Sequence, residues 1–169
     1  MAVITTTGSG NWNSTTADAP WPSGTVPNNT ADDVVIASGH TVTLTSGDQC
    51  KSLAVLSGGT FDGDGTGDLQ INGKNGAGLS VDLDGAINGT DTDLDIRCAS
   101  ATALDLEANG GGAIRNLIIN DSSCVATLER DTTLSGGLTI TAGQLTTGSD
   151  KDLTVDGDVS VTGTLTGNA

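Results

Sequence analysis

The chain has 169 residues with a formal net charge of −15, because six Lys and Arg stand against 21 Asp and Glu. Nucleic acid and anionic membranes are bound mainly through Lys and Arg, so this balance argues against both as partners. Leu, Val and Ile together number 36, while Phe occurs once, Trp twice and Tyr never. This composition predicts one domain with a narrow aliphatic interior.

The first seven residues have neither the basic region nor the apolar region of a signal peptide, and no apolar run approaches transmembrane length. If Met1 is the natural start, we expect a protein that is made and used without standard secretion. Cys50, Cys98 and Cys124 are odd in number and have no metal-ligand spacing. We predict buried free thiols, with one disulfide and one spare thiol as the alternative.

Residues 1–33 form an opening segment that is rich in Asn, Thr, Ser and Gly and contains both tryptophans and all three prolines. We predict an irregular N-terminal cap in which Trp12 and Trp21 cover the open end of an aliphatic column. His40, in a strand next to this cap, is assigned a structural role. The alternative is that the two indoles form an aromatic platform for a sugar ligand.

Residues 34–169 contain short runs in which apolar residues alternate with Thr, Ser or Asp before a Gly interrupts them. This period of two is typical of short, half-buried strands. Its clearest copies begin at Leu138 and Leu153, and 15 residues between them leave room for about three short strands but for no helical crossover. We therefore predict an all-β, single-stranded parallel β-helix (β-solenoid), with equivalent positions at Leu53, Leu69, Leu94, Leu117, Leu138 and Leu153.

The pattern Gly-Asn-Trp, a second Trp, Gly-x-Val-Pro, Asp-Asp-Val-Val-Ile and Gly-His-Thr-Val-Thr-Leu falls within residues 8–47. It resembles the opening segment of glycine-rich parallel β-helix proteins, which occur on bacterial surfaces and in the tail fibres, spikes and virion surfaces of phages. In those proteins the segment starts the β-helix. The resemblance covers about a quarter of the chain and implies the fold more specifically than the function.

One glycine-rich loop has carboxylates at alternating positions, Asp62 and Asp64, followed by Asp68. Such carboxylates can converge on a hard cation, which makes these three residues the candidate calcium ligands. The sequence lacks the Glu that an EF-hand loop would need twelve residues into the motif, where Gly73 stands instead. An acidic turn without metal is the favoured reading, so no cofactor is expected beyond this possible calcium ion.

A second acidic run contains Asp91, Asp93 and Asp95, which alternation places together on an outer strand face. Our expectation is a solvated acidic face. Arg97, Arg115 and Arg130 follow at intervals near one coil length. They could stack beside Asp95, Glu129 or Asp131 as salt-bridged surface residues. No Ser-His-Asp order, Cys-His pair or phosphate-binding loop is present in the sequence, so we expect a protein that is not an enzyme.

The leading functional expectation is a structural protein of a bacteriophage particle, which is what the resemblance implies for a chain without an export signal. It would be a capsid-decorating (cement) protein or a spike or fibre component, assembled in the host cytoplasm and located on the virion surface. Its expected partners are a capsid or other virion protein and copies of itself, most plausibly as a trimer. Alternatives are a bacterial cell-surface adhesin or a carbohydrate-binding β-helix, including one for a host-surface glycan, and then a polysaccharide lyase or hydrolase.

Overall fold

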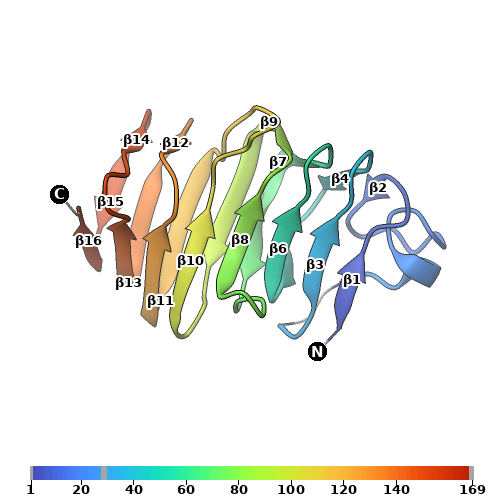
Figure 1. Ribbon diagram of the computed structural model, residues 1–169, viewed down its shortest axis with the longest axis horizontal. Helices are drawn as coiled ribbons and strands as arrows, with labels where there is room; N and C mark the ends of the chain where they lie inside the picture. Colours follow the sequence, from blue (N-terminus) through green and yellow to red (C-terminus); the bar gives the residue numbers. More distant parts are fainter. Residues whose placement is uncertain (1, 28–29, 168–169) are drawn as a thin grey trace.

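The computed structural model describes residues 2–27 and 30–167, together with their side chains except those of residues 64–66 and 89–91. Within this part of the chain all strand pairs are parallel, and the single helical element is the 3-10 turn η1 (Pro22–Gly24). The chain forms a β-solenoid of about six turns, which confirms the predicted fold class. Figure 1 shows the strands stacked along the long axis, with the two termini toward opposite ends.

Face A of the solenoid, which is turned toward the viewer in Figure 1, runs the whole length of the molecule. It consists of β1 (Val3–Thr5), β3 (Asp33–Ile36), β6 (Ser52–Val55), β8 (Leu79–Leu83), β10 (Ala101–Asp105), the last parts of β11 (Asn116–Leu128) and β13 (Leu138–Thr147), and β16 (Thr164–Thr166).

Face B follows face A in every turn and is the least regular of the three. It consists of β2 (Gly10–Asn11), β4 (Thr41–Leu44), the first parts of β7 (Thr60–Ile71) and β9 (Ala86–Ile96), and then β12 (Thr132–Leu134) and β14 (Leu153–Val155). Between β9 and β12 the turn is made by an irregular segment, from which Ile114 forms a bridge to Leu134.

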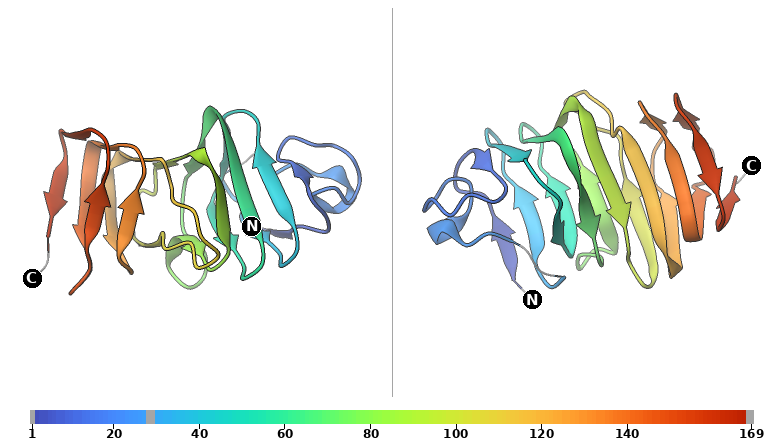
Figure 2. Two further views of the ribbon diagram at one scale, coloured as in Figure 1. Left: turned by 90° about the horizontal axis from the view of Figure 1, so that it is seen from above. Right: turned by 180° about the vertical axis from the view of Figure 1, so that it is seen from behind.

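Face C completes each turn and returns the chain to face A. It consists of β5 (Asp48–Cys50), the last parts of β7 and β9, the first parts of β11 and β13, and β15 (Val159–Val161). The four long strands bend across a corner, so each contributes to two faces. Figure 2 shows the strands behind face A stacked in the same order along the axis.

The interior is a set of aliphatic columns, because alternate residues of each strand point inward and register places like above like. On face C one column contains Cys50, Ile71, Ile96, Ile119 and Ile140, and all five side chains are buried. Faces A and B supply similar columns of Val, Leu and Ile. The predicted narrow aliphatic interior is therefore present.

The predicted coil boundaries are right in the middle of the chain and wrong at both ends. Leu69, Leu94, Leu117 and Leu138 are successive register partners on face C, as predicted. However, Leu53 lies on face A between Val34 and Val81, and Leu153 lies on face B beside Thr132. The next partner of Leu138 is Val159, so this coil has 21 residues and not 15. Similar Leu-Thr-Val patterns on two faces produced the error.

The N-terminal end is closed by the two tryptophans. Trp12 and Trp21 are fully buried, with ring centroids 5.1 Å apart in an edge-to-face arrangement, and Trp12 also packs on Phe61 at 6.2 Å. Trp12 Nε1 donates to Pro27 O at 2.9 Å, and Trp21 Nε1 donates to Trp12 O. Because both indole N–H groups have acceptors inside the segment, the rings can be buried without an unpaired donor.

The opening segment is not irregular throughout. Its strands β1 and β2 pair with β3 and β4, so the solenoid sheets begin before residue 33. His40, in the turn between β3 and β4, contacts Thr6 through Nδ1 and Oγ1 at 2.8 Å. Thr6 also accepts the N–H of Ala37 through Oγ1. These contacts join the first turn of the solenoid to the second.

Candidate functional site

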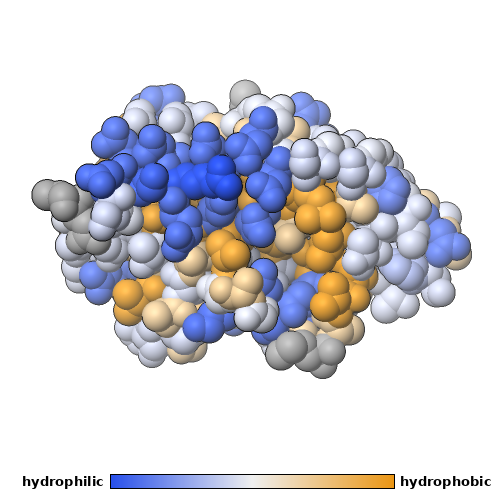
Figure 3. All heavy atoms as spheres, in the orientation of Figure 1, coloured by the Kyte–Doolittle hydropathy of each residue, from blue (hydrophilic) through white to orange (hydrophobic). Residues whose placement is uncertain are grey.

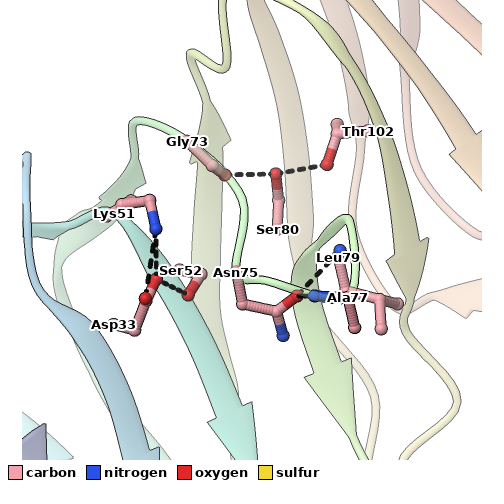
Figure 4. Close-up of polar contacts among 9 residues, drawn as sticks. All are labelled: Asp33, Lys51, Ser52, Gly73, Asn75, Ala77, Leu79, Ser80 and Thr102. Atoms are coloured by element: carbon pink, nitrogen blue, oxygen red, sulfur yellow. Dashed lines mark hydrogen bonds and ion pairs between the residues drawn. The ribbon is translucent and has the colours of Figure 1, made fainter. Parts of the chain in front are cut away.

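Four basic side chains bind aspartates on the surface of the solenoid, either in the same turn or in the preceding one. They are Lys51, Arg97, Arg115 and Arg130. Asp33 accepts Lys51 Nζ at 2.9 and 3.1 Å and Ser52 Oγ at 2.6 Å, as Figure 4 shows. Lys51 follows Asp33 by 18 residues, close to one turn. A charge pair at this spacing is a sequence signal for residues on adjacent turns, but it can be recognised only when the length of the turn is known.

The three arginines do not form a column. Arg97 follows β9 where face C meets face A, Arg115 precedes β11 where face B meets face C, and Arg130 lies between faces A and B. The expected stack is therefore wrong, because the irregular turns place the three residues at three different corners. Among the expected carboxylate partners only Asp95 is correct, since Arg97 binds it at 2.7 Å.

Arg115 and Arg130 instead reach back to the preceding turn. Arg115 binds Asp93 through Nε at 2.8 Å and through Nη2 at 2.5 Å, and Arg130 Nε binds Asp105 at 2.7 Å. Asp93 also accepts the backbone and side-chain N–H groups of Asn116. These bonds connect consecutive turns at the corners, so Arg115 and Arg130 stabilise the stacking of the solenoid.

The acidic run in β9 is not a solvated face. Asp93 and Asp95 are only 8% and 3% exposed, while the side chain of Asp91 lies outside the described residues. The sequence pattern placed these side chains correctly on the outward side of the strand, but it could not show that neighbouring turns and their arginines cover them. Asp95 Oδ1 is buried without a hydrogen-bond partner among the described atoms, although its other oxygen binds Arg97.

The candidate calcium ligands lie on one bent strand, β7. Asp62 is on face B between Thr43 and Asn88, whereas Asp68 is a register partner of Asp93 on face C. The side chain of Asp64 lies outside the described residues. Among the side chains that the structure describes, no three His, Cys, Asp or Glu residues are grouped as metal ligands. Calcium binding stays a prediction.

The pKa of Asp68 is raised because this side chain is partly buried and lies near two other carboxylates. Burial is the main cause that raises its pKa, followed by Asp93 and Asp95, while Arg115 and Arg97 act in the opposite direction. Asp82 on face A is similar, since burial, then Asp84 and Asp105, raise its pKa and Arg130 lowers it.

Face A carries an acidic groove of about 530 Å³ that lies over β8, β10 and the end of β11. Its charged lining consists of Asp82, Asp84, Asp105, Glu129 and Arg130. Figure 3 shows hydrophilic residues gathered along the upper part of this face and apolar residues nearer the N-terminal strands. Arg130 binds Asp105, but four carboxylates stand against this one guanidinium, so the groove keeps a net negative charge.

A hydroxyl contact and a polar loop connect β7, β8 and β10 (Figure 4). Ser80 Oγ contacts Thr102 Oγ1 at 2.6 Å and donates to Gly73 O, and both hydroxyl side chains are buried. In the same loop Asn75 Oδ1 accepts the N–H groups of Ala77 and Leu79 at 2.9 and 3.1 Å. This arrangement satisfies backbone donors locally and fixes the corner between β7 and β8.

The three cysteines are free and buried, in agreement with the favoured prediction. Burial raises the pKa of the Cys124 thiol to about 12, with a smaller contribution from nearby Cys98. Burial also raises the pKa of Cys50. Cys50 and Cys124 are therefore poorly suited to nucleophilic chemistry in the folded protein.

The C-terminal end has no counterpart to the tryptophan plug among the described residues. Val159, Val161 and Leu165 occupy inward-pointing positions of the last turn, yet they are 53%, 44% and 41% exposed. Leu138, Ile140 and Leu145, their register partners in the turn below, are at most 1% exposed. The open end is therefore an apolar surface on an otherwise acidic molecule.

In the part of the chain that the structure describes, no helix is long and apolar enough to cross a membrane. The chain matches no protein-family model, no curated protein and no solved structure.

Proposed function

We propose that this chain is a non-enzymatic structural protein of a bacteriophage particle. It would act as a capsid-decorating or cement protein, or as a spike or fibre component, on the virion surface after assembly in the host cytoplasm. Its partner would be a capsid or other virion structural protein. The proposal rests on the resemblance of residues 8–47 combined with the β-solenoid fold.

One structural observation supports a role in architecture in preference to catalysis. The arginines that could have served an acidic-polysaccharide enzyme are bound by aspartates of the wall, at 2.7 Å for Arg97 and Arg130 and at 2.5 Å for Arg115. The aspartates of these pairs, Asp93, Asp95 and Asp105, are each less than a tenth exposed. A substrate would have to displace Arg97 before it could contact the paired oxygen of Asp95.

The alternatives are a bacterial surface adhesin, a carbohydrate-binding β-helix and, less favoured, a polysaccharide lyase or hydrolase. For glycan binding, Trp12 and Trp21 are poor candidates because neither ring presents a face to solvent. A host-surface glycan would therefore need another surface. The acidic groove on face A would repel acidic polysaccharides and thus does not favour them as ligands.

The test is to locate the protein in the cells that produce it. Virus particles are purified from those cells by density-gradient centrifugation, and the protein is detected with an antibody in particles and in the washed cell envelope. We expect it at a fixed stoichiometry in intact particles, with antibody labels on their outer surface. Detection in the envelope and not in particles would contradict the proposal and support the adhesin alternative.

A further inference from the structure

Four asparagines of the chain are followed directly by glycine, namely Asn72, Asn75, Asn88 and Asn109. In such a pair the backbone nitrogen of the glycine can attack the side-chain amide carbon of the asparagine, because glycine has no Cβ to hinder the approach. The attack requires a backbone N–H that is not held in a hydrogen bond. It is favoured by donors that stabilise the charge developing on the side-chain oxygen. The structure therefore decides which of the four pairs can react.

The backbone nitrogen of Gly76 differs from those of the other glycines. The N–H groups of Gly73 and Gly110 each donate to a carbonyl of the preceding turn, at 2.8 and 3.0 Å. Asn88 lies within strand β9, where the backbone is extended. Gly76 is exposed, and its N–H has no hydrogen-bond acceptor among the described residues. Of these nitrogens, that of Gly76 can therefore lose its proton to water without breaking a contact between turns.

The side-chain amide of Asn75 is also placed for the reaction. Its Oδ1 accepts the N–H groups of Ala77 and Leu79 at 2.9 and 3.1 Å, while its amide nitrogen points away from both donors (Figure 4). The bond from Asn75 N to Leu79 O, 2.8 Å long, holds the donors in place. When the next backbone nitrogen attacks Cγ, negative charge develops on Oδ1, and two fixed N–H groups stabilise it as in an oxyanion hole. Among the described residues, the side-chain oxygens of Asn72 and Asn109 accept no hydrogen bond.

We propose that Asn75-Gly76 is a self-modification site, at which the folded protein deamidates selectively with the help of its own backbone N–H groups. The Gly76 nitrogen gives its proton to solvent and forms a bond to Asn75 Cγ. The Cγ–Nδ2 bond then breaks, Nδ2 takes a proton from solvent, and ammonia leaves behind a succinimide. Water opens this ring to aspartate or isoaspartate at position 75.

The product changes the corner between β7 and β8. Each event adds one negative charge, and isoaspartate inserts one methylene into the backbone, so the loop can no longer keep both bonds to Oδ1. The inference depends on the geometry of this loop and not on the proposed function.

The experiment follows deamidation at Asn72, Asn75 and Asn109 by peptide mass spectrometry, after incubation in isotopically labelled water at mildly alkaline pH. In the folded protein Asn75 should react about tenfold faster than the other two, which must first break a hydrogen bond between turns. In urea the three rates should become similar. The rate at Asn75 should then be lower than in the folded protein, because the unfolded chain holds no donors at Oδ1.

Gly76→Ala is the matched variant. A Cβ at this position meets nothing within 4 Å, and the backbone is not in the left-handed region, so the fold should be unchanged by circular dichroism. The added methyl group should slow the reaction at Asn75 several-fold and leave the rate at Asn109 as an internal control.

Two results would overturn the proposal. If Asn75 reacts no faster than Asn72 or Asn109 in the folded protein, the free N–H of Gly76 does not select the site. If Asn75 reacts faster in urea than in the folded protein, the N–H groups of Ala77 and Leu79 protect the amide instead of promoting its loss.

Discussion

The two ends of this solenoid are built differently. The N-terminal end is sealed by Trp12 and Trp21, which come from the segment before the second turn and have no exposed surface. The C-terminal end stops at a turn that has the same apolar inward positions as those below it, but its side chains are about half exposed. The last turn is thus a continuation of the repeat without a cover.

This difference shows that a repeating fold needs two kinds of sequence. The repeat itself requires only alternating aliphatic residues and corners, because each turn supplies the surface on which the next one packs. An end requires residues that can bury apolar surface without presenting a new edge. Large aromatic side chains with satisfied N–H groups meet this need at the N-terminal end. Four predictions test the contrast, beginning with the largest effect.

The first prediction compares two positions of one column. Ile119 and Val161 are both inward-pointing on face C, but Ile119 is fully buried and Val161 is 44% exposed. Ile119→Asp should prevent soluble folding because it buries an unpaired charge at a cost of several kcal/mol. Leu117→Asp should do the same. Val161→Asp should fold with a melting temperature within a few degrees of wild type.

Circular dichroism and thermal melting measure these outcomes. The wild-type spectrum should be almost wholly β, with less than about a tenth helix. A soluble and normally melting Ile119→Asp protein would show that the assignment of the inward face is wrong.

The second prediction compares a buried side chain at the N-terminal end with a partly exposed one in the last turn. Trp21→Ala should lower the free energy of unfolding by about 3–5 kcal/mol, because it removes a fully buried indole that packs on Trp12. Leu165→Ala, at the open end, should cost about 1 kcal/mol or less since the side chain is already 41% exposed. Urea denaturation measures both values. Equal losses for the two variants would mean that the open end is covered in solution.

The third prediction compares a buried carboxylate, Asp93, with an exposed one in the last turn, Asp158. Asp93 accepts hydrogen bonds from Arg115 and Asn116 and is buried, whereas Asp158 is exposed. Asp93→Asn should reduce the free energy of unfolding by about 1–3 kcal/mol, since the hydrogen bonds from Arg115 lose a charged acceptor. Asp158→Asn should change it by less than about 0.5 kcal/mol. If Asp158→Asn lowers the free energy of unfolding more than Asp93→Asn does, then the buried ion pair of Asp93 contributes less to stability than its contacts imply.

The fourth prediction is kinetic and uses the buried thiols as reporters. Cys124 lies in β11, two turns before the last turn, while Cys50 lies in the turn next to the tryptophan plug. Burial keeps both thiols protonated near pH 8, because it raises the pKa of each, to about 12 for Cys124. Modification must therefore follow local opening, which returns the pKa to its ordinary, lower value.

If the open end frays first, a thiol reagent at pH 8 should label Cys124 several times faster than Cys50. Peptide mass spectrometry after short exposures identifies the labelled residue. A trace of denaturant should accelerate labelling at Cys124 before it affects Cys50. Simultaneous labelling would instead mean that the solenoid opens as one cooperative unit, in which case the two ends have the same local stability.

The sequence was a good guide wherever a local pattern has one structural meaning. Alternation of Leu or Ile with polar residues predicted the strands, and equivalent leucines predicted the register from Leu69 to Leu138. It failed where the same pattern occurs on two faces, as at Leu53 and Leu153. It also failed for the aspartates of β9, because alternation indicates which side of a strand a residue occupies but not what covers that side.

The sequence by itself determined the β-solenoid, its aliphatic interior and the negative charge, since these follow from composition and a period of two. Only the tertiary structure decided the length of each turn, and therefore which charges meet. Asp33 finds Lys51, and Asp93 finds Arg115, because corners of different length place these residues on adjacent turns. Corner length is set by packing between turns, which no short stretch of sequence encodes.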